Sequence, residues 1–235
     1  MKLIYDLGFC DGADTAWYLS KGFRVVAVEA DPRLADQGKE RFHDSIRSGR
    51  LTLLNVGVAA SKGTLPFYVN ESNAHWSSFD TAYGCRGGTP FHVIEVATVT
   101  IDDLLRRYGC PYYMKIDIEG VDRIVLQQMR DVSCRPTHIS VEEFGVATLD
   151  AIAEIGYTKA RVVPQKHRRT GFLPIIWREG RYVPRKKFDG NCSGPFGRDL
   201  RLPWLTIDQA RDVLNSARTD PAELKSGEWW DVHAT

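Results

Sequence analysis

The chain has 235 residues, of which 43% are hydrophobic and 26% are charged, and its 31 basic and 30 acidic residues leave a net charge of +1. This composition is typical of a globular protein that can bury a substantial core, and the near-zero charge excludes a global field that would attract nucleic acid or an anionic membrane. No apolar run approaches the roughly 20 residues of a membrane-spanning helix. We therefore expect no membrane span and no nucleic-acid partner, while the oligomeric state stays open.

The cysteines are odd in number and widely separated, with no C-x-x-C pair: Cys10, Cys85, Cys110, Cys134 and Cys192. This spacing fits neither a zinc site nor a redox motif, so it indicates reduced thiols. The N-terminus enters a strand without the basic and apolar segments of a signal peptide. Together these features predict a cytoplasmic protein.

A glycine-rich turn follows the first apolar run, residues 3–5, and leads into a helix near Thr15. Gly8 and Gly12 are spaced G-x-x-x-G rather than G-x-G-x-x-G, so the dinucleotide-binding fingerprint is absent. The N–H groups at the helix start would point toward a ligand in the turn. The sequence therefore predicts a ligand-binding turn here, with a plain strand-to-helix connection as the alternative.

Strands alternate with helices along the rest of the chain. The expected strands are residues 3–5, 24–28, 51–56, 65–69, 92–99, 112–118, 137–144 and 157–163. Helical patterns cover residues 33–48, 121–129, 147–155 and 207–217, and a further helix starts at the capping residue Thr100. This alternation predicts a mostly parallel α/β sheet with helices on both faces and a ligand site at the carboxyl ends of the strands.

Several stretches interrupt the alternation. Residues 70–92 form a long, polar, glycine-rich loop, and loops of this length usually carry function. Residues 172–177 are expected to form a hairpin with the strand 157–163. We predict a main domain over residues 1–180, and an extension over residues 181–235 whose aromatic end packs back and contributes to an acceptor pocket.

Acids end four of the expected strands: Asp6, Glu29, Asp117 and Glu142. Glu29 lies about 20 residues after the first glycine turn, where an acid accepts hydrogen bonds from a ribose. Nicotinamide dinucleotides and S-adenosylmethionine both use such an arrangement. Asp11 and Asp14 in the turn would repel a pyrophosphate, so the charge pattern favours S-adenosylmethionine.

Two longer motifs carry a family resemblance. Asp6-Leu7-Gly8…Asp11-Gly12, with Glu29 after the second strand, resembles the first motif and ribose-binding acid of class I S-adenosylmethionine-dependent methyltransferases. Thr100-Ile101-Asp102-Asp103-Leu104-Leu105, followed by Lys115-Ile116-Asp117-Ile118-Glu119-Gly120, is similar to the signature of the FkbM family, which commonly has Glu where this chain has Asp122. The resemblance covers roughly residues 3–145.

The resemblance implies a Rossmann-like class I fold with a seven-stranded sheet whose last strand is antiparallel. It implies O-methylation of a sugar, glycan or polyketide-like secondary metabolite with S-adenosylmethionine as cofactor. The implied cofactor residues are Asp6, Gly8, Asp11, Gly12, Glu29, Ala30, Asn55, Val58, Ala59 and Asp117. Val58 and Ala59 are equally explained as core residues.

A hydroxyl acceptor must lose its proton during methyl transfer, and the candidate bases are Asp117, Glu119, Glu142 and His75. Asp117 is preferred by its position, while Glu119 is equally explained as a cap on the next helix. We expect Lys115 to pair with Asp103 or Glu119.

Asp117, Glu142 and Glu143 could offer oxygen ligands to Mg²⁺, but their spacing does not require an ion, and we predict no metal. The basic runs at residues 166–169 and 185–187 would suit an anionic acceptor or simply form a solvated surface. The competing hypotheses are methylation of a protein or nucleic acid, and a non-catalytic binding module with the same fold.

Overall fold

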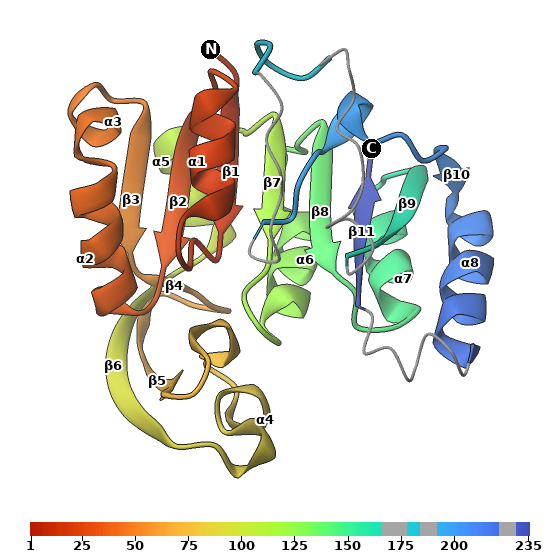
Figure 1. Cartoon of the computed structure of the whole chain (residues 1–235). Coiled ribbons are helices and arrows are strands. Elements are labelled where there is room, and N and C mark those ends of the chain that lie inside the picture. Colours follow the sequence, from red (N-terminus) through yellow and green to blue (C-terminus); the bar gives the residue numbers. More distant parts are fainter. Residues whose placement is uncertain (166–177, 184–191, 221–228) are drawn as a thin grey trace.

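The computed structural model describes residues 1–165, 178–183, 192–220 and 229–235 (Figure 1). The predicted strand at residues 172–177 and the basic runs at residues 166–169 and 185–187 lie outside this part of the chain.

An eight-stranded sheet forms the centre of the protein, in the order β10-β9-β11-β8-β7-β1-β2-β3. Its strands are β1 (Leu3–Leu7), β2 (Arg24–Glu29), β3 (Leu51–Asn55), β7 (Tyr113–Ile116), β8 (His138–Glu142), β9 (Lys159–Pro164), β10 (Leu205–Thr206) and β11 (Trp230–Ala234). The run from β3 to β8 is parallel, and β11 lies antiparallel to both β8 and β9. The sheet is thus mostly parallel and its last strand antiparallel, as predicted, but it has eight strands rather than seven because β10 pairs with the edge of β9.

The main helices alternate with these strands. They are α1 (Ala13–Ser20), α2 (Pro32–Arg41), α3 (His43–Arg47), α5 (Ile101–Tyr108), α6 (Asp122–Asp131), α7 (Ala147–Glu154) and α8 (Ile207–Thr219). The single helix predicted over residues 33–48 is wrong, because Phe42 leaves the helical conformation (φ −106°, ψ 19°) between α2 and α3. Its ring packs edge-on against Phe9, with ring centroids 5.9 Å apart.

Two hydrophobic cores hold the helices to the sheet. Leu3, Tyr5 and Leu7 of β1 belong to a core that includes residues of α5, α6, α7 and α8. Ile4, between them in sequence, belongs to a second core with residues of α1. Since successive strand residues point to opposite faces, the two cores lie on the two sides of the sheet. In Figure 1, α1 is in front of the sheet and α5 is behind it.

A second, three-stranded sheet stands beyond the carboxyl ends of the central strands. It has the order β4-β6-β5 and consists of β4 (Gly57–Val58), β5 (Gly63–Asn70) and β6 (Phe91–Val99). The segment between β5 and β6, predicted as a loop, contains α4 (Thr81–Gly84) and the 3-10 helices η1 (Ala74–Trp76) and η2 (Arg86–Gly88). Figure 1 shows this unit beyond the arrowheads of β1, β2 and β7, which places it over the expected ligand edge.

One buried side chain, Asn70, organises that segment. Its Oδ1 accepts a backbone hydrogen bond from Asn73 (2.9 Å), and its Nδ2 donates to Gly84 O (2.9 Å) and Thr89 Oγ1 (2.6 Å). A single amide thus holds both ends of the segment, because it can donate and accept at once.

The end of the chain is built into the central sheet. β11 lies between β8 and β9, with Val232 opposite Val141 on one side and Val162 on the other. The expected extension therefore contributes two of the strands of this sheet, β10 and β11. Within the described residues, no helix is both long and apolar enough to cross a membrane.

Cys110 and Cys134 form a disulfide bond, with their Cα atoms 5.8 Å apart. The prediction that all the cysteines are reduced is therefore wrong for this pair. Cys110 precedes β7 and Cys134 follows α6, so the fold brings together two residues that the spacing did not relate. The bond also removes the argument from reduced thiols on which the expected cytoplasmic location rested.

Replacing Cys110 and Cys134 together by serine should lower the free energy of unfolding by about 3 kcal/mol, because the bond restricts the unfolded chain. Urea denaturation followed by circular dichroism measures this change. Cys85→Ser, a free cysteine, is the control. Equal stability of the double variant and the oxidised wild type would show that the disulfide has no stabilising role.

Candidate active site

The carboxyl ends of the central strands form one wall of a cleft, and the three-stranded sheet forms another. The space along the cleft is about 790 Å³, including the part that is open to solvent. Residues along it include Gly8, Phe9, Cys10, Val28, Glu29, Ala30, Leu34, Val58, Phe67, Phe79, Asp117 and Ile118. The carboxyl edge is thus the candidate site, as the sequence predicted.

Gly8 allows the turns after β1 and β7 to touch. It has a φ of +91°, and a Cβ atom built there would lie 1.8 Å from the carbonyl oxygen of Asp117. Any other residue would push the two turns apart. Gly12 has a packing role instead: its Cβ would lie 2.5 Å from the ring of Phe9.

Lys115 is the charged centre beneath the cleft. Its buried ammonium nitrogen lies 3.5 Å from Asp6 Oδ1, 3.5 Å from Asp14 Oδ2 and 3.2 Å from Asp117 Oδ2. It also donates a hydrogen bond to Gly8 O at 3.2 Å. Burial disfavours the charge, but the surrounding carboxylates outweigh burial and raise the pKa of Lys115 well above its usual range.

The predicted partners of Lys115 are therefore wrong. The carboxylate of Asp103 accepts a hydrogen bond from the backbone N–H of Thr100 in the capping box of α5. The carboxylate of Glu119 pairs with Arg86. Both acids are near Lys115 in sequence, but their side chains are held by other elements of the fold.

Asp6 supports the site from behind. It is fully buried, accepts a hydrogen bond from Thr15 Oγ1 (2.6 Å), and does not line the cavity. Burial raises the pKa of Asp6 to about 6, although the ammonium of Lys115 opposes this rise. Asp6 thus positions Lys115 and the start of α1.

Glu29 lies in the wall of the cavity. Its Oε2 accepts the backbone N–H of Cys10 (2.7 Å) and its Oε1 accepts that of Asp31 (2.8 Å). Burial raises the pKa of Glu29 to about 7. Asn55 stands behind this turn and donates to the carbonyl oxygens of Glu29 (2.9 Å) and Ala30 (3.1 Å).

The predicted cofactor residues divide into two groups. Those that line the cavity are Gly8, Glu29, Ala30, Val58 and Asp117. Those that do not are Asp6, Asp11, Gly12, Asn55 and Ala59. Sequence reasoning missed the apolar wall of Phe9, Leu34, Phe67 and Phe79, because its members come from separate elements and share no local pattern.

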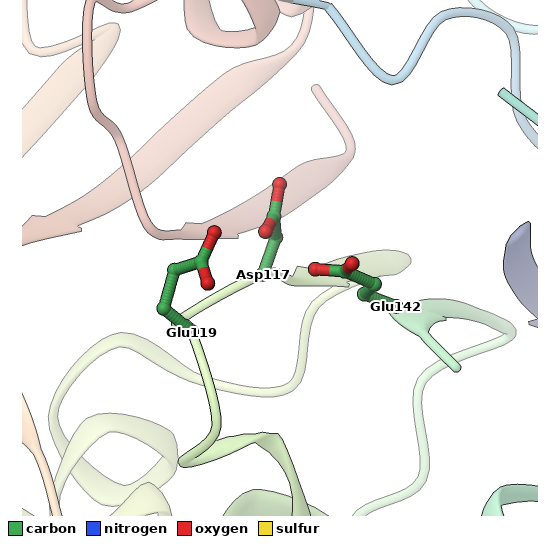
Figure 2. Close-up of side chains that lie close together, drawn as sticks. All are labelled: Asp117, Glu119 and Glu142. Atoms are coloured by element: carbon green, nitrogen blue, oxygen red, sulfur yellow. The ribbon is translucent and has the colours of Figure 1, made fainter. Parts of the chain in front are cut away.

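Three carboxylates meet at the mouth of the cavity: Asp117, Glu119 and Glu142, shown in Figure 2. One oxygen of each lies within 4.8 Å of the others, a grouping that could hold a metal ion. Glu143, which the sequence placed in a possible magnesium set, is not part of it. The carboxylate of Glu143 accepts hydrogen bonds from Arg218 Nη1 (2.6 Å) and Gly145 N (2.6 Å).

Burial and the repulsion between neighbouring carboxylates raise the pKa of two acids in this cluster, Glu142 and Glu119. Burial, and then the charge of Asp117, raise the pKa of Glu142 to about 9. The same two causes raise the pKa of Glu119 to about 7, against the opposing charge of Arg86. At neutral pH Glu142 is therefore a protonated donor, while Glu119 is poised between its two forms.

Glu119 is held from the side of the three-stranded sheet. It has a φ of +45°, its backbone oxygen accepts a hydrogen bond from Ser78 Oγ (2.6 Å), and its carboxylate pairs with Arg86. The interpretation of Glu119 as a helix cap is wrong, since the carboxylate that accepts from Ile118 N (3.1 Å) and Gly120 N (3.2 Å) at the start of α6 is that of Asp122.

His75 and the carboxylates also border a second cavity, whose space of about 1180 Å³ includes open solvent. It is lined by Asp14, Asn73, His75, Trp76, Arg86, Asp117, Glu119, Glu142, Gln165, Cys192, Ser193, Trp229 and Asp231. Asp14, His75, Asp117 and Glu119 line both cavities, so the two spaces meet at these side chains. His75 reaches back to the first cavity, where Nδ1 lies 3.5 Å from Cys10 Sγ.

A mostly parallel sheet with adjoining cavities at its carboxyl edge has the layout in which α/β folds bind their ligands. Residues 6–161 match the family model described as Methyltransferase FkbM domain. The chain therefore belongs to the FkbM methyltransferase family, as its motifs predicted.

Solved structures of other methyltransferases resemble the chain distantly. A methyltransferase FkbM from Methylobacillus flagellatus KT is 18% identical with a TM-score of 0.40, and the match covers 60% of this chain but 32% of that one. A putative rRNA-methylase from Clostridium thermocellum is 13% identical with a TM-score of 0.36, covering 69% and 76% of the two chains. This chain thus corresponds to about a third of the first protein's length. No curated protein matches it.

Replacing Lys115 by methionine should cost about 3–5 kcal/mol of stability, because it leaves buried carboxylates without their counter-ion. Chemical denaturation at pH 7 measures the loss. Lys39→Met, which removes an exposed pair with Asp36, is the matched control and should change stability by less than about 1 kcal/mol. A similar small effect at both positions would contradict the central role of Lys115.

Proposed function

We propose that the protein is an S-adenosylmethionine-dependent O-methyltransferase that acts on a hydroxyl of a sugar, glycan or polyketide-like metabolite. The observation that carries this proposal is the meeting of the two cavities at Asp117 and Glu119. A donor in the first cavity and an acceptor in the second would face each other across these carboxylates, and such placement supplies much of the rate in a displacement reaction.

The lining of the first cavity supports the cofactor. The carboxylate of Glu29 suits the two hydroxyls of a ribose, and the side chains of Val58, Phe67 and Phe79 suit the flat, apolar faces of adenine. Asp14 and Asp117 would repel a pyrophosphate but favour a sulfonium and an amino group. The cofactor, when bound, supplies a methyl group on a good leaving group.

Asp117 is the proposed general base. One of its oxygens is 3.2 Å from Lys115 Nζ, while the side chain is 41% exposed toward the cavities. Lys115 therefore fixes the carboxylate and leaves it able to take the proton of an acceptor hydroxyl. Glu119 is the alternative base, since its pKa of about 7 suits proton transfer near neutrality.

The second cavity supports a neutral acceptor rather than an anionic one. Its acids, among them Asp117 and Asp231, would accept hydrogen bonds from hydroxyls and repel phosphate groups, while Trp76 and Trp229 offer faces for a ring. This lining disfavours nucleic acid as the acceptor, in agreement with the near-neutral charge of the chain.

Glu29→Ala should weaken the binding of S-adenosylmethionine about 10- to 100-fold, because a buried charged acceptor of hydrogen bonds is lost. Isothermal titration calorimetry measures the affinity. Glu40→Ala, an exposed acid on α2, is the control. Absence of S-adenosylmethionine binding by the wild type would overturn the proposed cofactor.

Asp117→Asn should keep the affinity for S-adenosylmethionine within about threefold and lower turnover by about 10²- to 10⁴-fold, as expected for loss of a general base. Transfer of a tritiated methyl group to a panel of methyl glycosides measures turnover. Glu143→Gln, whose side chain pairs with Arg218, is the matched control. Unchanged turnover in Asp117→Asn would assign the base to another residue, with Glu119→Gln as the next variant.

A further inference from the structure

Gln165 places an amide in the wall of the second cavity at the end of β9. The residue is 7% exposed, and its Nε2 is buried with no hydrogen-bond partner in the part of the chain that the structure describes. A buried donor without a partner is costly and therefore uncommon in folded proteins. Because Gln165 lines the cavity, a ligand there could supply the missing acceptor.

The neighbours of Gln165 come from the adjoining strands of the sheet. Its backbone N–H donates to Trp229 O at 3.0 Å, which fixes the end of β9 beside the start of β11. Asp231 on β11 is paired in register with Glu142 on β8. The residues Gln165, Trp229, Asp231 and Glu142 thus line the cavity from strand ends that are hydrogen-bonded to one another.

The charged side chains that line this cavity are mostly acidic, and some of them are paired. Asp14 and Asp117 pair with Lys115, and Glu119 pairs with Arg86. In the described part of the chain, the acids of this lining outnumber its bases, so the cavity offers carboxylate oxygens to hydroxyl groups and disfavours a phosphate group.

We propose that Gln165 is a specificity-determining residue of the acceptor subsite, where its amide donates a hydrogen bond to an oxygen of a hydroxyl-rich ring without phosphate groups, such as a pyranose. Trp229 covers a face of that ring, and Glu142 and Asp231 bind its hydroxyls. This inference rests on the proposed methyltransferase function, and it names the part of the chain that selects the acceptor: the ends of β8, β9 and β11, outside the sequence motifs of the family.

Saturation-transfer NMR on the protein loaded with S-adenosylhomocysteine tests the subsite. The neutral probes are methyl α-D-glucopyranoside and methyl α-L-rhamnopyranoside, and the charged probe is glucose 6-phosphate. We expect signal from at least one neutral probe and none from glucose 6-phosphate. Gln165→Leu should reduce the neutral signal at least fivefold, with unchanged calorimetric affinity for S-adenosylhomocysteine and an unchanged or higher melting temperature.

The melting temperature separates binding from structure, because removing an unpartnered amide should not destabilise the protein whereas removing a structural one would. Gln37→Leu, on the exposed side of α2, is the matched control and should bind the probes like the wild type. Equal neutral signal in Gln165→Leu and wild type, no neutral signal in the wild type, or preferential binding of glucose 6-phosphate would each overturn the inference. Failure of S-adenosylhomocysteine to bind would instead overturn the proposed function.

Discussion

The site depends on one buried ammonium group. Lys115 Nζ interacts with carboxylates from β1, α1 and the turn after β7, contributed by Asp6, Asp14 and Asp117. An isolated charge in this position would be prohibitively costly, so the acids and the lysine require one another. The same group donates to Gly8 O, and Gly8 is the residue that lets the two turns touch. The glycine turn at Gly8 and the signature segment that contains Lys115 and Asp117 are therefore held together by direct contacts.

The carboxylates of the cleft differ in their ion pairs and hydrogen-bond partners because they lie in different surroundings. Asp117 is held by Lys115, Glu119 by Arg86, and Glu142 lies beside both of these acids. Burial, together with the charge of Asp117, raises the pKa of Glu142, whereas Glu29, elsewhere in the cleft, accepts two backbone hydrogen bonds. Under the proposed function, the first cavity is the cofactor side and the second is the acceptor side, with Asp117 between them.

Local patterns predicted the parts of the fold that depend on neighbours in sequence. The alternating strands and helices, the capping box at Thr100 and the acids at the strand ends all follow from side-chain periodicity and short-range hydrogen bonds. The predictions that proved wrong have a different cause, which is long-range packing. The Cys110–Cys134 bond, the partners of Lys115 and the role of Glu119 depend on residues that approach only when separate elements pack together.

The sequence by itself determined the sheet, the ligand edge and the family, because each is encoded in contiguous residues. Only the tertiary structure decided which of the predicted residues reach the cavity. Asp6 and Asn55 were predicted to bind the cofactor, yet they support the site from behind, whereas Gln165 and Trp229 lie outside every motif and line the second cavity. The physical reason is that a cavity wall is assembled from the ends of several strands, and its composition is fixed by their pairing rather than by any one segment.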